Sequence, residues 1–292
     1  MTPLLETSAL RIDVAGTVAI DGLSLSSTGE WVLVLGGARA LFEAVSGLRA
    51  IERGQVRVEG CSPSVAIRQG VAASAPLDPL LPLRWTPRSY ARWSASLAGH
   101  PSGVAKSMAA EALARLDLQS FADARLSGAT APVRRATVIA AALATGATTL
   151  LVEDPLTDLA EPMRRPFART VVRALAGRRI AFFGAHVALE SPVGLAADEA
   201  IVINGSDVAQ QGPPAQLAAS ERALALRVAG NTAAFATAVC AAGATLLGPV
   251  DGSQETRLRI DAGPLATRDV LRIALECRAV VLEVHPIARA FA

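Results

Sequence analysis

Residues 31–48 read WVLVLGGARALFEAVSGL, and this stretch decides the fold class. Its first five residues form an unbroken apolar run, which is typical of a central strand buried on both faces. Gly36 and Gly37 follow, and the apolar residues of 39–48 then recur at helical spacing, with Gly47 near the end, where helices often stop. The order of strand, turn and helix predicts an α/β protein in which helices cover a sheet.

Short runs of alternating polarity extend this pattern along the chain. Strands are expected at 8–14, 19–26 and 54–59, and again at 148–154 and 178–184. Between the two groups, from about 77 to 130, a proline-marked loop leads into helices. Thr86 followed by Pro87 opens the first of these as N-cap and first-turn residue. We therefore expect a sheet domain that carries a helical insert.

The last part of the chain predicts a separate small domain. Its segments read in the order strand, helix, strand, strand, helix, strand, the third being TLLGPV at 245–250. This order indicates a ferredoxin-like α+β unit. We expect a first domain over 1–220, with the insert inside it, and a second over 221–292.

Composition excludes several functional classes. The chain has 292 residues with 28 basic and 26 acidic side chains, a net charge of +2, so we expect no nucleic-acid partner. Cys61, Cys240 and Cys277 lie too far apart for metal-ligand spacing and suit a reducing compartment. No apolar stretch is long enough to span a membrane, and the N-terminus does not resemble a secretory signal, so a cytoplasmic location is expected. Lys106 is the only lysine, which limits chemistry that needs one.

Five short segments serve as landmarks along the chain. They are Leu35-Gly36-Gly37, GQVRVEG at 54–60, LSGAT at 126–130, LLVEDP at 150–155, and Ala185-His186. Their order and spacing together resemble the ATP-binding subunit of an ABC transporter, and the small C-terminal unit is similar to one appended to ATPase subunits of bacterial exporters. The resemblance implies a P-loop NTPase-like nucleotide-binding domain and a peripheral position on the inner face of the membrane. It also implies two partners, a second ATP-binding subunit and a multi-span membrane permease.

The phosphate-binding turn departs from this family's pattern. A phosphate loop needs several successive backbone N–H groups, a lysine, and a hydroxyl for Mg²⁺. Aligned on the helix that follows, the turn here is four residues short: Gly37 takes the place of the last glycine, Ala38 that of the lysine and Arg39 that of the hydroxyl. We expect no cofactor in this chain's own site, and Lys106 lies in the insert, where it cannot substitute.

The other expected nucleotide contacts also differ. The family's Asp-Glu pair aligns with Glu153 and Asp154, in reverse order, whereas the histidine aligns with His186. The residues at three further family positions have changed chemistry: the adenine-stacking aromatic, the glutamine and the aspartate of the following loop. They align with Val14, Leu77 and Ala160.

Another part of the pattern survives. Leu126-Ser127-Gly128 matches the first three residues of the family signature, whose helix faces the ATP held by the other subunit. A helix N-terminus suits a phosphate whatever the rest of its chain can do. The resemblance thus implies that Ser127 and Gly128 complete a partner's Mg-ATP site. The alternative is that Ser127 only caps the helix and Gly128 eases packing.

Three smaller features complete the expectations. Arg39, at a helix N-terminus, is expected either to reach Glu153 or Asp154 or to be solvated. The arginine pairs 134–135, 164–165 and 178–179 are expected on solvated faces, the alternative being contact of some with lipid headgroups or the partner subunit. An apolar and aromatic group follows the proline-marked loop, and the resemblance implies that it receives a cytoplasmic helix of the permease; the alternative is that its aromatics form the insert's own small core. The group consists of Leu81, Leu83, Trp85, Tyr90 and Trp93.

The sequence therefore predicts a non-hydrolysing ABC transporter subunit that pairs with a competent ATP-binding subunit. Two alternatives stay open. One is an unusual but active ATPase that drives export, in which Arg39 replaces the lysine. The other is a stand-alone scaffold or regulator.

Overall fold

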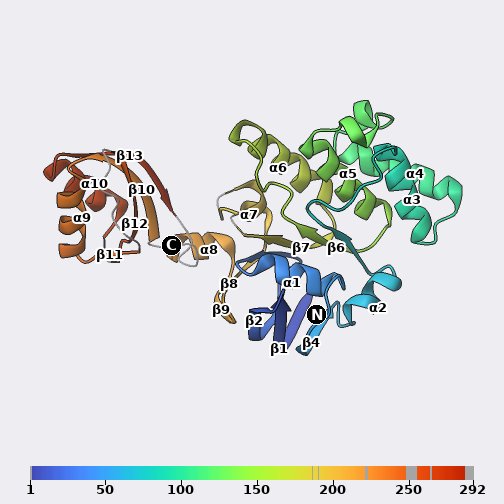
Figure 1. Ribbon diagram of the computed structural model, residues 1–292, viewed down its shortest axis with the longest axis horizontal. Coiled ribbons are helices and arrows are strands. Elements are labelled where there is room, and N and C mark those ends of the chain that lie inside the picture. The colour runs from blue at the N-terminus through green and yellow to red at the C-terminus, as the bar shows by residue number, and fades with distance from the viewer. Residues whose placement is uncertain are drawn as a thin grey trace. The chain divides into compact units, whose positions relative to one another are not determined.

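The structure is a computed structural model that describes residues 2–185, 187–189, 191–220, 223–247, 255–263 and 265–286 (Figure 1). The chain divides into two compact units, Met1–Pro214 and Ala215–Ala292. The sequence predicts the boundary after residue 220, whereas the structure has it after Pro214. Helix α8 (Pro214–Ser220) therefore begins at the observed boundary, although the sequence assigns it to the first domain.

The first unit alternates strands and helices. Its strands are β1 (Leu5–Val14), β2 (Thr17–Ser26), β3 (Trp31–Leu35), β4 (Arg53–Val58), β5 (Ala72–Ala75), β6 (Thr149–Glu153), β7 (Arg179–Gly184), β8 (Glu199–Asn204) and β9 (Asp207–Gly212). Its helices are α1 (Ala38–Val45), α2 (Pro63–Arg68), α3 (Pro87–Leu97), α4 (Ser102–Arg115), α5 (Ala131–Ala144), α6 (Glu161–Leu175) and α7 (Pro192–Ala196), with 3₁₀ turns at Gln119–Phe121 and Leu126–Gly128.

The main sheet has the strand order β5-β6-β7-β3-β8-β9. The four pairings among β5, β6, β7, β3 and β8 are parallel, and only β9 runs antiparallel to its neighbour. Every residue of β3 is buried, which confirms the central strand expected from its continuous apolar run.

Helix α1 packs between this sheet and a smaller antiparallel one of order β2-β1-β4 (Figure 1). Its Leu41, Phe42 and Val45 are buried in one core with residues of both sheets, and the ring of Phe42 lies edge-on to Phe183 of β7 at 5.6 Å. The helix ends earlier than expected, at Val45, because Gly47 already has a φ of +67°.

The expected helical insert contains α3 and α4, which pack against each other and against α5 (Figure 1). Thr86 caps α3 as predicted. Its hydroxyl accepts the backbone N–H of Ser89 at 3.2 Å, while the Ser89 hydroxyl receives the N–H of Thr86 at 2.8 Å.

The second unit is the expected βαββαβ unit with a ferredoxin-like sheet. Its antiparallel strands have the order β11-β12-β10-β13. The expected strand at 245–250 is shorter in the structure, where it covers only Thr245–Leu246, and 248–250 lie outside the described residues. The elements are β10 (Ala223–Gly230), α9 (Thr232–Ala241), β11 (Thr245–Leu246), β12 (Glu255–Asp261), α10 (Thr267–Glu276) and β13 (Ala279–Pro286).

In neither unit is any of the described helices both long enough and apolar enough to cross a membrane.

Candidate functional site

The turn between β3 and α1 consists of Gly36 and Gly37 alone. Both have positive φ, +73° and +49°. A Cβ on Gly36 would lie 2.0 Å from the carbonyl oxygen of Ile203 in β8, so only glycine fits there. Helix α1 begins at once with Ala38, and its N-cap residue Gly37 offers no side chain. The connection is thus as short as the sequence predicts.

Arg39 extends from the first turn of α1 toward carboxylates. Its Nε lies 3.3 Å from Oε1 of Glu43 and 3.9 Å from Oε1 of Glu153. The side chain of Arg39 is 77% exposed, so water screens both pairs and each contributes at most about 1 kcal/mol. Both expectations for Arg39 therefore hold in part: it approaches Glu153, and it remains solvated.

Glu43 is the better-held partner of Arg39. Burial alone would raise the pKa of its carboxyl, but hydrogen bonds from Arg49 and Arg39 outweigh burial and lower the pKa. Glu43 therefore stays ionised at neutral pH and keeps the Arg39 guanidinium close to the first half of α1.

Glu153, the last residue of β6, accepts a hydrogen bond from a distant backbone group. Its Oε2 receives the N–H of Leu77 at 2.8 Å, and its side chain is only 13% exposed. The carboxylate therefore holds the chain where the family resemblance aligns a glutamine.

Asp154 is buried and serves its own loop. Its Oδ1 accepts the N–H of Leu156 at 2.8 Å, and its Oδ2 accepts the hydroxyl of Thr157 at 3.1 Å. Burial raises the pKa of this carboxyl, although the two hydrogen bonds and the nearby Arg135 and Arg164 oppose the rise. An aspartate so engaged shapes the turn after β6.

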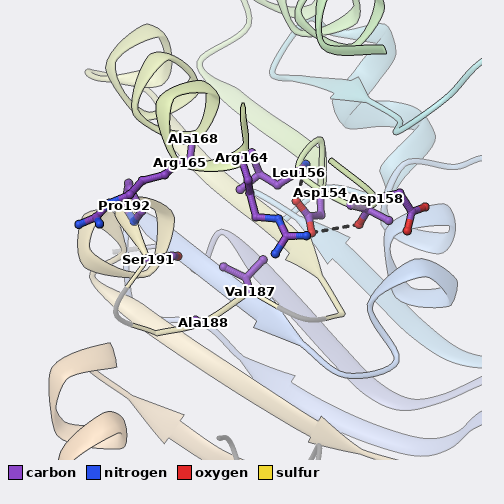
Figure 2. A pocket seen from close by; sticks show the side chains of 11 residues that line it. Asp154, Leu156, Asp158, Arg164, Arg165, Ala168, Val187, Ala188, Ser191 and Pro192 are labelled. Carbon is purple, nitrogen blue, oxygen red and sulfur yellow. Dashed lines mark hydrogen bonds between the residues drawn. The ribbon is translucent and has the colours of Figure 1, made fainter. Parts of the chain in front are cut away.

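A cavity of about 480 Å³ opens beside Asp154, between the loop after β6, helix α6 and the start of α7 (Figure 2). Figure 2 shows the Arg164 side chain reaching toward Asp154, with Val187 beneath it. His186, expected in the catalytic set, lies outside the described residues, while the neighbouring Val187 and Ala188 line the cavity.

The signature residues lie on the surface, in the 3₁₀ turn Leu126–Gly128. Ser127 and Gly128 are exposed, and among the described residues the Ser127 hydroxyl has no hydrogen-bond partner. The N-cap of α5 is Thr130, not Ser127, and its side chain makes no capping bond. The capping alternative for Ser127 is therefore wrong, because the 3₁₀ turn places this serine before the helix.

The aromatic residues of the insert lie together, and their rings are partly packed against one another and partly exposed. The ring of Trp85 lies 6.5 Å from that of Tyr90 and 5.6 Å from that of Trp93, and the rings of Tyr90 and Trp93 are 6.0 Å apart. Trp93 is 44% exposed and Leu83 is exposed, whereas Leu81 is half-buried. Burial raises the pKa of the Tyr90 phenol. The cluster forms a small core that continues onto the surface.

The sequence did not predict the contact between Arg135 and Asp78. Arg135 was expected on a solvated face, but it is only 6% exposed. Its guanidinium binds the carboxylate of Asp78, at 3.4 and 3.1 Å, and the carbonyl oxygens of Pro155 and Thr157. The only signal was an arginine within the alanine-rich run of α5, and paired arginines are usually exposed.

Comparison with known proteins identifies the fold. No family model matches the chain, and no curated protein matches its sequence. Solved structures do match. CbiO1 from Clostridium perfringens, part of the ABC transporter complex CbiONQ, has 17% identity and a TM-score of 0.63, over 75% of this chain and 92% of that one.

Two further structures agree. An ATP-binding subunit of an ABC transporter has 14% identity and a TM-score of 0.60, over 73% of this chain and 91% of its own. A nucleotide-free ATP-binding cassette from an ABC transporter has 15% identity and a TM-score of 0.58, over 72% and 91%. This chain therefore has the fold of an ABC nucleotide-binding domain, as the sequence predicts.

Proposed function

We propose that this chain, which has the fold of an ABC transporter ATP-binding subunit, acts as a non-hydrolysing member of a transporter complex. In this complex it pairs with a second, catalytically competent ATP-binding subunit and a multi-span membrane permease. Mg-ATP is held by the partner subunit and not by this chain.

The observation that carries the proposal is the two-glycine turn. A phosphate loop curls several N–H groups around an anion, and a connection of Gly36 and Gly37 has too few of them. The carbonyl oxygen of Ile203 closes one side of the turn, and Ala38 stands where a lysine is needed. A triphosphate at this turn would meet the guanidinium of Arg39 and the first N–H groups of α1, but neither a lysine nor a loop that wraps around it.

The two carboxylates support the same proposal. Glu153 is engaged by Leu77, and Asp154 by Leu156 and Thr157. A metal ligand or a general base needs free lone pairs directed at the reacting atoms. Both carboxylates instead direct oxygens at groups of their own chain.

A role in the partner's site is supported by the exposed Ser127 and Gly128. They lie just before α5, whose N-terminal N–H groups and dipole favour an anion. Pro132 in the first turn lacks an N–H, and the N–H groups of Ser127 and Gly128 are already bound to Leu83 and Arg125. The serine hydroxyl and the remaining N–H groups at the start of α5 would therefore make the contact.

The permease is proposed to bind at one apolar surface of the insert. This apolar surface consists of Leu81, Leu83, Trp85, Tyr90 and Trp93. Exposed aromatic side chains in a preformed cluster are favoured anchors of interfaces. The complex would then lie against the inner face of the cell membrane as part of an exporter.

Titration of the isolated chain with Mg-ATP tests the proposal. We expect no heat of binding at millimolar nucleotide and no phosphate release. Sub-millimolar binding with turnover would instead establish the active-ATPase alternative. Isolation of the chain from native membranes should yield a permease and a lysine-bearing ATP-binding subunit; recovery of the chain alone would favour a scaffold.

The role of Ser127 is tested in the reconstituted complex. Ser127→Arg should lower its ATPase rate at least about tenfold, because a bulky cation would displace the γ-phosphate contact. Ser64→Arg, at an exposed serine on α2, is the matched control and should leave the rate unchanged. Equal rates for the two variants would contradict a contact in trans.

A further inference from the structure

The connector between β5 and α3, residues 76–86, contains neither helix nor strand, yet it is tied down at both ends. At its start, the N–H of Leu77 is bound by Glu153 and the carboxylate of Asp78 by Arg135. At its end, the carbonyl oxygen of Leu83 accepts the N–H of Ser127 at 3.0 Å. The connector therefore has fixed attachment points although it lacks regular structure.

Glu153 makes the first tie with one oxygen of its carboxylate. Oε2 receives the Leu77 N–H at 2.8 Å, and Oε1 faces Arg39 at 3.9 Å. The hydrogen bond is charge-assisted and mostly shielded from water, which makes it stronger than an exposed one. The end of β6 thus holds the start of the connector.

Arg135 makes the second tie. It projects from α5, and its buried guanidinium contacts the Asp78 carboxylate on one side and the carbonyl oxygens of Pro155 and Thr157 on the other. A buried guanidinium needs several acceptors because an unpaired one would be costly. Moving the connector away would leave Arg135 without its only carboxylate hydrogen bond among the described contacts.

We infer that Glu153 and Arg135 form a latch, made only of protein groups, that holds the connector in one position whether or not nucleotide is present. The connector carries Leu81, Leu83 and Trp85, so the latch keeps the apolar surface ready for a partner. This reading of the surface rests on the proposed function, whereas the latch itself rests on the contacts above.

Hydrogen–deuterium exchange of the full chain tests the latch. In Glu153→Ala, the peptide that contains Leu77 should exchange about tenfold faster than in wild type, while β3 peptides stay protected. Glu153→Gln keeps an acceptor oxygen and should retain part of the protection. Glu111→Ala, which removes an exposed glutamate that pairs with Arg115 on α4, is the matched control and should have no effect on the connector.

A second variant guards against misfolding. Asp78 is 54% exposed, so Asp78→Ala should fold, and it should also speed exchange of the Leu77 N–H. Unchanged exchange in both Glu153→Ala and Asp78→Ala would overturn the latch.

Millimolar Mg-ATP should leave wild-type exchange unchanged. A nucleotide-induced change at the connector would overturn its independence of nucleotide. Binding of nucleotide elsewhere, with the connector unaffected, would contradict only the proposed function.

Discussion

Glu153 is the last residue of β6 and Asp154 follows it directly, and their carboxylates hold different parts of the chain. Glu153 binds the N–H of Leu77 at 2.8 Å, whereas Asp154 binds the N–H of Leu156 at 2.8 Å. Neighbouring residues at a strand end point to opposite faces of the sheet, so each acid meets a different loop. The pair therefore joins two loops to the strand.

This division predicts the outcome of restoring the family order. On the proposed function, the double variant Glu153→Asp with Asp154→Glu should show no ATP hydrolysis in a phosphate-release assay, because the two-glycine turn is unchanged. It should also unfold at lower temperature than wild type. An aspartate at 153 is one methylene short of Leu77, and a glutamate at 154 is one methylene too long for the hydrogen bonds to Leu156 and Thr157. Phosphate release by this variant would show that the turn binds nucleotide after all.

The turn itself predicts a sharp difference between two glycines. Gly36→Ala should lower the free energy of unfolding by roughly 3 kcal/mol or more, because its Cβ would collide with the carbonyl oxygen of Ile203 at a positive φ. Gly37→Ala is the matched control. Its Cβ would meet nothing nearer than 3.7 Å, so only the left-handed backbone costs energy, about 1 kcal/mol. Urea denaturation measures both, and equal losses would contradict the close approach of β8.

Glu199 predicts a pH dependence of stability. Burial alone would raise the pKa of its carboxyl, but hydrogen bonds from Gln211, Gly29 and Thr28 outweigh burial and lower the pKa below its ordinary value of 4.5. A group whose pKa is lower in the folded state stabilises the fold above its unfolded pKa. That contribution disappears as the pH falls through the folded pKa.

The measurement compares wild type with Glu199→Gln by urea denaturation across pH. Their difference in unfolding free energy should be constant at neutral pH and shrink as the pH falls below the ordinary carboxyl value of 4.5. A difference that grows in acid would have the wrong sign for this network.

The aromatic cluster predicts a loss of binding to the proposed permease when its most exposed ring is removed. Trp93→Ala should weaken recovery of the proposed permease in a pull-down at least about tenfold, as expected for an anchor residue. Phe121→Ala, at a residue 46% exposed elsewhere in the insert, is the control and should leave recovery unchanged. Equal recovery for both variants would place the permease contact elsewhere.

Local signals in the sequence were enough for much of the fold. The apolar run of β3, the paired glycines and the Thr86 cap each depend on residues next to each other in the chain, and each is confirmed. The short turn could be predicted for the same reason, because the number of residues between a strand and a helix is visible in the sequence.

The rest depends on contacts between distant segments. Arg135 and Asp78 are 57 residues apart, so the residues adjacent to either of them in the sequence do not predict that they pair. The position of Ser127 before the helix follows from hydrogen bonds of its turn to Leu83 and Trp85, which also come from another segment. Charged residues buried by tertiary contacts look like surface residues in the sequence.

The close approach of β8 to Gly36 also limits how the turn could be redesigned to hold a phosphate. A residue other than glycine at position 36 would strike a main-chain oxygen, and a lysine at Ala38 would enter a buried position. No single substitution therefore turns this connection into a phosphate-binding loop. Such a redesign would have to add residues to the turn and move β8 at the same time.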